Sequence, residues 1–304
     1  MYIKSMIHKI SIHYILMAVA VVLTIGVTTM LCTRIKTKED TNRIMLKSID
    51  DVPQEYWVKL AEKRIFFGHK SVGYNIIDGI EDILNECKQI KLNIVETCDP
   101  AEFDLPIFAH SQVGSNTDPV SKIESFTNIM DVGVGNKVDI AFFKFCYVDV
   151  TRDSDPQKIL DRYRAAIEDM EDRYPQTRFL HVSAPIRSVP KGAKRTLKQS
   201  VKLLIGKPGV LDDNMMRLRY NKLLNDAYFE TGSVFDLALI ESIRPGGVRC
   251  YAAKGAERVY VMAPEYTEDG GHLNRLGRKK VAEQLLIILA EMASSLYTYA
   301  VDVS

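Results

Sequence analysis

Short apolar runs rich in β-branched and aromatic residues alternate with longer segments of helical period over most of this chain. Strands are expected at 64–67, 92–95, 138–143, 178–182, 234–237 and 259–262, and helices at 74–87, 119–130, 156–174, 212–231 and 274–297. The run at 138–143 is apolar throughout, which is typical of a strand buried on both faces. Strands that alternate with helices predict an α/β fold with a parallel sheet and helices on both faces. In such a fold, a site is expected at the carboxyl ends of the strands.

The segment 15–32 contains no charged residue. As a helix it would extend for about 27 Å, enough to cross a thin bilayer. It is long for the apolar part of a signal peptide, and no A-x-A site closes it, so we expect one uncleaved N-terminal transmembrane helix. A buried helix of a soluble protein is the alternative. We therefore expect a membrane anchor at 1–33, a polar linker at 34–57 and a globular domain at 58–304.

The charges on either side of this segment leave its orientation open. Lys4 and Lys9 precede it, and Arg34, Lys36 and Lys38 follow it. Basic residues usually flank the cytoplasmic end of a membrane helix, and here they flank both ends.

Composition excludes some partners. The 304 residues carry a formal net charge of +1, which argues against a globally basic nucleic-acid-binding protein. The five cysteines show neither CxxC nor zinc-site spacing, so no metal site is expected. A basic stretch at 191–207, which contains no acidic residue, is interpreted as a mobile cap over a site, as a helix on a membrane surface or as a solvated insertion.

The sequence Asp269-Gly270-Gly271-His272-Leu273-Asn274 immediately precedes the last expected helix. Its spacing lets the Asp269 carboxylate reach Nδ1–H of His272 and leaves Nε2 free to act as a general base. A simple turn with a helix cap is the alternative, because Asp and Gly are common turn residues.

A base of this kind needs a nucleophile, and Ser71 is the best candidate. The run Phe66-Phe67-Gly68-His69-Lys70-Ser71-Val72-Gly73 joins the first expected strand to a helix through a tight turn. A serine hydroxyl there becomes nucleophilic when a neighbouring base takes its proton. The alternative is a serine that only caps the following helix.

These two motifs together resemble the SGNH (GDSL-like) hydrolase superfamily over roughly residues 60 to 296. The resemblance implies a three-layer α/β/α fold and ester hydrolysis or acyl transfer without a metal or other cofactor. It assigns Ser71 as nucleophile, His272 as base and Asp269 as its partner. The chain departs from the family pattern, because Gly-His-Lys-Ser stands where Gly-Asp-Ser is usual.

The resemblance also implies an oxyanion hole with a glycine N–H and an asparagine side chain. Gly114 and Asn116 are the candidates, although loop composition alone would explain both. The family's Gly-x-Asn-Asp motif is missing, and the run Lys144-Phe145-Cys146-Tyr147-Val148-Asp149 stands in its place. Cys146 is a weak donor and a poor substitute for asparagine. His69 and Lys70 replace the family's aspartate and are candidates for substrate binding.

The expected function is therefore that of a membrane-anchored, single-pass serine esterase or deacetylase. Its substrate would be a small-molecule or polysaccharide ester, its cofactor none, and its domain extracytoplasmic by analogy with the family. An O-acyltransferase with the same triad and a non-catalytic carbohydrate-binding protein on the same fold are the alternatives. The sequence does not indicate an oligomeric state.

Overall fold

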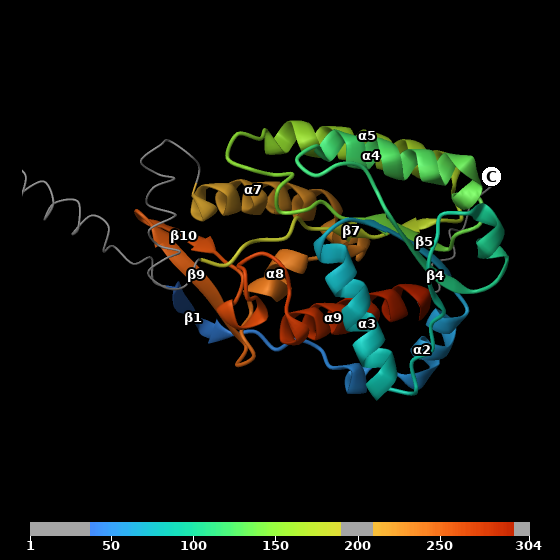
Figure 1. The fold of residues 1–304 in the computed structure, drawn as a ribbon, viewed down its shortest axis with the longest axis horizontal. Coiled ribbons are helices and arrows are strands. Elements are labelled where there is room, and N and C mark those ends of the chain that lie inside the picture. The colour runs from blue at the N-terminus through green and yellow to red at the C-terminus, as the bar shows by residue number, and fades with distance from the viewer. Residues whose placement is uncertain (1–36, 190–208, 295–304) are drawn as a thin grey trace, which may run out of the picture. The chain divides into compact units, whose positions relative to one another are not determined.

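A central parallel sheet organises the chain (Figure 1). The computed structural model describes residues 37–189 and 209–294. In spatial order the strands are β3 (Ile94–Glu96), β4 (Ile107–Gln112), β2 (Arg64–His69), β5 (Ile140–Phe143) and β6 (Arg178–Phe179). Every neighbouring pair is parallel. The α/β fold with a parallel sheet expected from the sequence is confirmed.

The sheet continues through a second, short parallel pair. Strand β7 (His181–Val182) pairs with β8 (Val234–Phe235). Only Leu180 separates β6 from β7, and its N–H donates to the carbonyl of Ala141 on β5. With β6 and β7 counted as one strand, the spatial order is β3, β4, β2, β5, β6–β7 and β8. The chain begins in the middle with β2 and extends to both sides, a doubly wound order that places ligands at the carboxyl edge.

Helices cover both faces of the sheet because the side chains of each strand alternate. Ile65 and Phe67 of β2 point into one apolar cluster, and Phe66 points into another. The first cluster packs against α2 (Gln54–Ala61), α3 (Val72–Glu86), α8 (Leu237–Ser242) and α9 (Arg275–Ser294). The second packs against α4 (Pro119–Ile129), α5 (Pro156–Arg173) and α7 (Val210–Tyr228). The arrangement is three-layered, α/β/α.

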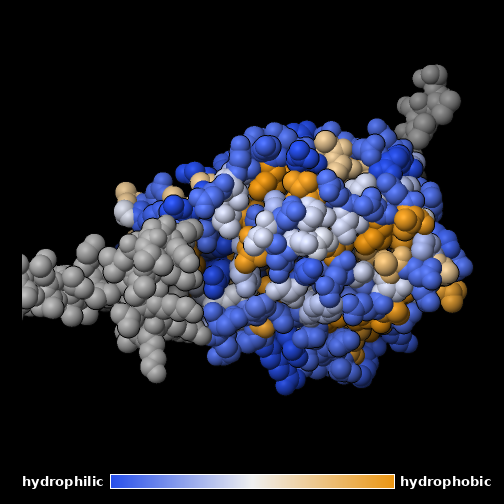
Figure 2. Space-filling view, turned by 45° about the horizontal axis from the view of Figure 1, so that its top comes forward, coloured by the Kyte–Doolittle hydropathy of each residue, from blue (hydrophilic) through white to orange (hydrophobic). Residues whose placement is uncertain are grey.

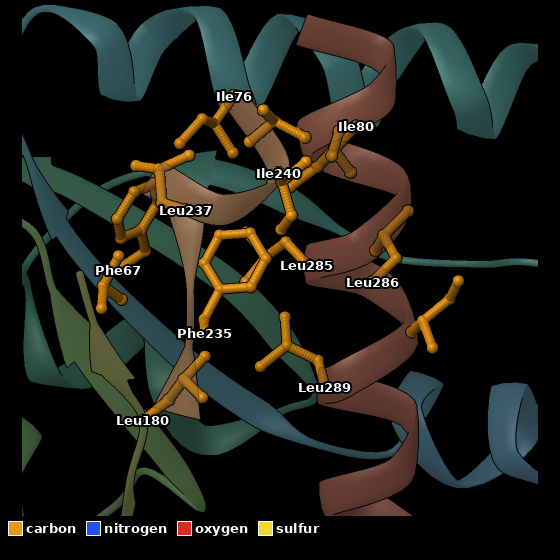
Figure 3. Close-up of a cluster of buried hydrophobic side chains, with 14 of the residues drawn as sticks. Phe67, Ile76, Ile80, Leu180, Phe235, Leu237, Ile240, Leu285, Leu286 and Leu289 are labelled. Carbon is orange, nitrogen blue, oxygen red and sulfur yellow. The ribbon is translucent and has the colours of Figure 1, made fainter. Parts of the chain in front are cut away.

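Figure 3 shows side chains of the first apolar cluster in close-up. Phe235 from β8 lies next to Leu285 and Leu289 of α9, and Phe67 from the sheet lies beside Leu237 in the same cluster. Ile76 of α3 reaches the same cluster from above. One continuous apolar layer thus fixes α3 and α9 together on the sheet. Short helical turns complete the connections: η1 (Ile49–Asp51), η2 (Pro100–Asp104), η3 (Met130–Val134), η4 (Phe229–Thr231) and η5 (Pro264–Tyr266).

Helices α3 and α9 approach closely at a glycine. A Cβ built on Gly79 would fall on the carbonyl group of Arg278 and lie 2.9 Å from the Cβ of Ala282. The Arg278 guanidinium then reaches across to α3, where it contacts Asp82 at 2.9 Å and Asp78 at 3.2 Å. Because α3 begins directly after Ser71 and α9 soon after His272, this contact determines how the two turns face each other.

The strand expected at 259–262 does not join the parallel sheet. Strand β10 (Glu257–Tyr260) instead forms an antiparallel hairpin with β9 (Val248–Lys254). The hairpin turns at Gly255, whose φ of +61° favours glycine. β1 (Thr37–Arg43) pairs antiparallel with the other edge of β9. Two strands joined by so short a turn can only pair antiparallel, which is why residues 259–262 do not join the parallel sheet.

The segment expected to be a polar linker contains regular secondary structure. Part of the range 34–57 forms β1, η1 and the beginning of α2. The candidate anchor at 15–32 and the basic stretch at 191–207 lie outside the described residues. Within the part of the chain that the structure describes, no helix is both long and apolar enough to span a bilayer.

Hydrophilic residues dominate the face shown in Figure 2, with apolar residues between them. The exposed large apolar side chains of the described residues are Met45, Val58, Leu105, Val132, Phe229 and Leu276. They lie on separate elements, as expected of an ordinary protein surface.

The close approach of α3 and α9 can be tested at Gly79. Gly to Ala within a helix normally stabilises a protein by about 1 kcal/mol. Here the added methyl group must displace the backbone of α9, so Gly79→Ala should lower the free energy of unfolding by about 1–3 kcal/mol. Urea denaturation measures the change, with Glu81→Ala, at an exposed position of α3, as the control. A stabilised Gly79→Ala variant would contradict this packing.

Candidate active site

Ser71 occupies a strained turn between β2 and α3. Its backbone φ is +53°, which is unusual for a residue other than glycine, and its ψ is −108°. The side chain makes no capping hydrogen bond to α3, so the helix-cap alternative does not hold. A side chain on Gly73 would collide with the ring of His69, so the turn also needs a glycine there. Strained strand-to-helix turns of this kind expose a hydroxyl for reaction.

His272 and Asp269 lie next to Ser71 in the arrangement expected from the sequence. Ser71 Oγ is 2.8 Å from His272 Nε2, and His272 Nδ1 is 2.7 Å from Asp269 Oδ2. The second carboxylate oxygen, Oδ1, accepts hydrogen bonds from the backbone N–H groups of Gly271 and His272, each at 2.8 Å. The structure thus brings the three residues into one hydrogen-bonded chain.

The charge of Asp269 determines the tautomer of His272. Burial alone would raise the pKa of the carboxyl, but the hydrogen bonds from the His272 side chain and from the backbone of His272 and Gly271 hold the pKa well below its usual range. An ionised carboxylate can only accept hydrogen bonds. Nδ1 of His272 therefore carries a proton, and in the neutral imidazole Nε2 presents its lone pair to Ser71.

Two further contacts support the Asp269–His272 turn. The N–H of Leu273 donates to Asn75 Oδ1 of α3 at 3.3 Å, linking the turn directly to the helix that follows Ser71. The N–H of Gly270 donates to Thr267 Oγ1 at 2.9 Å. The chain reaches this turn from β10 through a segment in which the N–H of Met262 donates to the Arg187 carbonyl. His272 therefore lies on a loop that hydrogen bonds hold at the carboxyl edge of the sheet, and this loop does not follow a strand of the parallel sheet.

Tyr147 is a neighbour of the triad that the sequence did not indicate. Its ring meets the His272 imidazole edge to face, with centroids 5.9 Å apart. The Arg187 guanidinium lies 5.0 Å from the centre of the same ring, and its Nε donates to the Gly270 carbonyl at 3.4 Å. A Cβ on Gly271 would come within 3.0 Å of the ring. Tyr147 follows β5, so its place at the carboxyl edge was the only available signal.

Gly114 lies against the Ser71 turn, as required of an oxyanion-hole candidate. The Lys70 ammonium donates to the Gly114 carbonyl at 2.8 Å, and the neighbouring Val113 N–H donates to the His69 carbonyl at 3.0 Å. Gly114 has a φ of +56°, and a Cβ there would lie 2.5 Å from the backbone N of Lys122. Within residues 37–189 and 209–294, the N–H groups of Gly114 and Ser71 donate no hydrogen bond.

Asn116 is held by a buried ion pair. Its Oδ1 accepts from Lys122 Nζ at 3.2 Å. Lys122 also pairs with the buried Asp149 carboxylate, which in turn accepts from the N–H groups of Thr117 and Cys146. This network fixes the loop that carries Gly114 and Asn116. A role for Asn116 in an oxyanion hole stays a prediction.

The structure does not favour His69 as a substrate-binding residue. Its side chain is fully buried, and Nε2 lies 3.0 Å from Nδ1 of His110. Burial, the Lys144 charge and His110 together lower the pKa of His69 to about 3, which keeps the ring neutral. The alternation of side chains along β2 turns His69 inward, toward the face that also holds Phe67. Lys70 is half-buried at the site but bonded to Gly114, and its contact with substrate stays a prediction.

Comparisons with known proteins give neighbours by structure but none by sequence. No family model matches the chain, and no curated protein matches it significantly. A Streptococcus pneumonia protein assigned as a platelet activating factor is similar at TM-score 0.43 and 16% identity, covering 78% of this chain and 92% of its own. A Desulfitobacterium hafniense protein assigned to the lipolytic G-D-S-L family gives 0.41 and 9%, covering 74% and 98%.

A third solved structure is the periplasmic domain of a lipopolysaccharide acetyltransferase from Salmonella ser. Paratyphi A. It is similar at TM-score 0.43 and 11% identity, covering 74% of this chain and 83% of its own. The G-D-S-L family named among these neighbours is the one that the two sequence motifs resemble. Because these TM-scores are below 0.5, the similarities carry no argument about function, which depends on the geometry around Ser71.

Proposed function

We propose that this protein is a serine-dependent esterase or deacetylase with Ser71 as nucleophile, His272 as general base and Asp269 as the residue that orients it. The observation that carries the proposal is the chain of two short hydrogen bonds, 2.8 Å and 2.7 Å, that links the three side chains. The strained Ser71 turn supports it, since a serine that served only to cap α3 would not need a positive φ.

The reaction follows from these contacts. Nε2 of His272 takes the hydroxyl proton as Ser71 Oγ attacks the acyl carbon of an ester, and the imidazolium that forms is stabilised by Asp269. The alcohol leaves with that proton, and the acyl group stays on Ser71. Water then attacks the acyl carbon while His272 takes its proton. The bond between the acyl carbon and Ser71 Oγ breaks, the acid leaves, and the imidazolium returns the proton to Ser71 Oγ. The free N–H groups of Ser71 and Gly114 are the proposed donors to the oxyanion.

Exposure of the triad is consistent with attack by water or by another acceptor. The His272 side chain is 45% exposed and the Asp269 side chain 54% exposed. An O-acyltransferase would use the same acyl-serine step with an acceptor alcohol in place of water. For the substrate we propose an ester-linked acyl group, with acylated carbohydrates as the first class to assay.

Substitutions in the triad test the catalytic proposal. Ser71→Ala and His272→Ala should each lower kcat/KM on a short-chain aryl ester by about 10³-fold or more, because the members of such a unit act together. Asp269→Asn should cost less, since its role is orientation and charge stabilisation. Circular dichroism confirms folding, and Ser294→Ala, at the end of α9, is the matched control.

A fluorophosphonate probe provides the independent readout of the same proposal. Wild-type protein and Ser294→Ala should be labelled on Ser71, and Ser71→Ala should not. More than a tenth of the wild-type activity in Ser71→Ala or His272→Ala would refute the triad. A folded wild-type protein that is not labelled would favour a non-catalytic, carbohydrate-binding role.

The acyl acceptor separates hydrolysis from transfer. With p-nitrophenyl acetate as donor and a methyl glycoside as competing acceptor, a hydrolase should release acetate in equal amount to nitrophenol. We expect this result, because the exposed triad admits water. Acetylated glycoside that rises with acceptor concentration until it exceeds acetate would instead identify an acyltransferase. Chromatography of the products quantifies both.

We also propose that residues 1–33 anchor the protein to a membrane, with the domain outside the cytoplasm. The apolar segment 15–32 motivates this proposal. The full chain should stay in the membrane pellet after a carbonate wash, whereas a chain that begins at residue 34 and keeps β1 should be soluble. Release of the full chain by carbonate would contradict a transmembrane helix. Protease access in intact cells would test the orientation.

A further inference from the structure

The peptide group that precedes Ser71 is held from the protein interior by three donors. The carbonyl oxygen of Lys70 accepts hydrogen bonds from Lys144 Nζ at 3.2 Å, from Cys146 Sγ at 3.3 Å and from the N–H of Gly73 at 3.2 Å. Lys144 and Cys146 lie just beyond β5 and are buried. Two side chains and one backbone group thus converge on a single carbonyl beside the proposed nucleophile.

Lys144 is an unusual component of this arrangement. Its side chain is fully buried, and its amino group contacts the carbonyls of Lys70 and Phe145 and the sulfur of Cys146 at 3.8 Å. Within the described ranges it forms no ion pair, and the nearby Asp149 carboxylate is paired with Lys122. Burial lowers the pKa of Lys144, which reflects the cost of keeping a charge there.

A buried amine with this set of partners contributes less to the stability of the fold than a hydrophobic side chain would. Removing an ammonium group from water carries a large desolvation cost, and a hydrophobic side chain of similar size would fill the space without that cost. The partners of Lys144 indicate another role, because one of its hydrogen bonds ends on the carbonyl of the residue directly before Ser71.

The geometry of the peptide bond connects Lys144 to the reacting centre. In a trans peptide the C=O and the N–H point in opposite directions, and no cis peptide occurs in the described residues. The Lys70 carbonyl points inward to Lys144 and Cys146, so the N–H of Ser71 points away from them. That N–H donates no hydrogen bond within the described part of the chain and is therefore free for an oxyanion. Donors on the carbonyl also polarise the amide and strengthen its N–H as a donor.

We propose that Lys144 is a positioning residue for the oxyanion site: its buried amino group holds the Lys70–Ser71 peptide so that the N–H of Ser71 faces the developing oxyanion. The inference rests on the proposed serine esterase function. Lys144 belongs to the run that replaces the Gly-x-Asn-Asp motif. In place of an asparagine that contacts the oxyanion, this run supplies a buried side chain that holds the donor peptide in position. Cys146 adds a second, weaker hydrogen bond to the same carbonyl.

The variant Lys144→Met tests the inference, because it keeps an unbranched side chain only one atom shorter and removes the donor. We expect kcat on a short-chain aryl ester to fall on the order of 10- to 100-fold with KM changed less than threefold, since only the transition state bears the oxyanion. Affinity for a trifluoromethyl ketone, which forms an oxyanion on Ser71, should fall by a similar factor. Cys146→Ala should show a smaller loss of both.

A control separates this role from loss of stability. His181→Phe also removes a buried polar group, which contacts Tyr163 Oη at 2.9 Å and does not touch the Ser71 turn. It should lower the melting temperature and leave kcat within twofold. Each variant is assayed where circular dichroism shows it folded, and Lys144→Leu, which also lacks a donor, serves in the same assays if Lys144→Met does not fold.

The outcomes also distinguish this inference from the proposed function. Unchanged kcat and unchanged ketone affinity in the folded Lys144 variant, with wild-type protein labelled by fluorophosphonate at Ser71, would overturn the role of Lys144 alone. A wild-type protein that is neither labelled nor active would overturn the triad, and the Lys144 inference with it. A loss of kcat in His181→Phe equal to that in Lys144→Met would attribute the effect to stability and refute the inference.

Discussion

The close contact between α3 and α9 is the constraint on which the rest of the site depends. Ser71 precedes α3 and His272 lies just before α9, so the distance between the hydroxyl and the imidazole is set by how these helices pack. Gly79 allows the backbones to meet, and Arg278 ties α9 to two aspartates of α3. Both helices also share the apolar layer on the sheet around Phe67 and Leu285. A hydrogen bond of 2.8 Å between distant residues is therefore supported by packing well away from it.

The candidate triad could be read from the sequence because its members lie in local motifs. The turn at Ser71 and the spacing of Asp269 and His272 are encoded in a few consecutive residues each. The core strands at 64–67 and 138–143 were also evident, since burial on both faces leaves continuous apolar runs. Strand β4 was missed because its sequence, Ile107–Gln112, mixes apolar residues with His110, Ser111 and Gln112 and gives no clear period.

What could not be predicted depends on contacts between distant segments. Residues 259–262 have strand character, but only pairing with β9 and β1 decides that they leave the parallel sheet. The sequence made His69 a candidate for substrate binding, whereas its inward orientation follows from the register of β2 between β4 and β5. In the sequence, Lys144 directly follows the expected strand at 138–143, and no pattern marks it as buried. Its burial beneath the Ser71 turn depends on how closely β2 and β5 lie together, which no local pattern records.

The separation of the triad along the chain has a consequence for its biogenesis. Ser71 and His272 are 201 residues apart, and the helix that holds His272 in place is the last described element. During synthesis the sheet strands and α3 emerge long before α9, but Ser71 lacks its hydrogen-bond partner His272 until α9 docks on α3. The nascent chain therefore carries the Ser71 hydroxyl without the His272 imidazole while the residues between them are made. On the proposed mechanism, acyl transfer begins only when α9 has packed against α3.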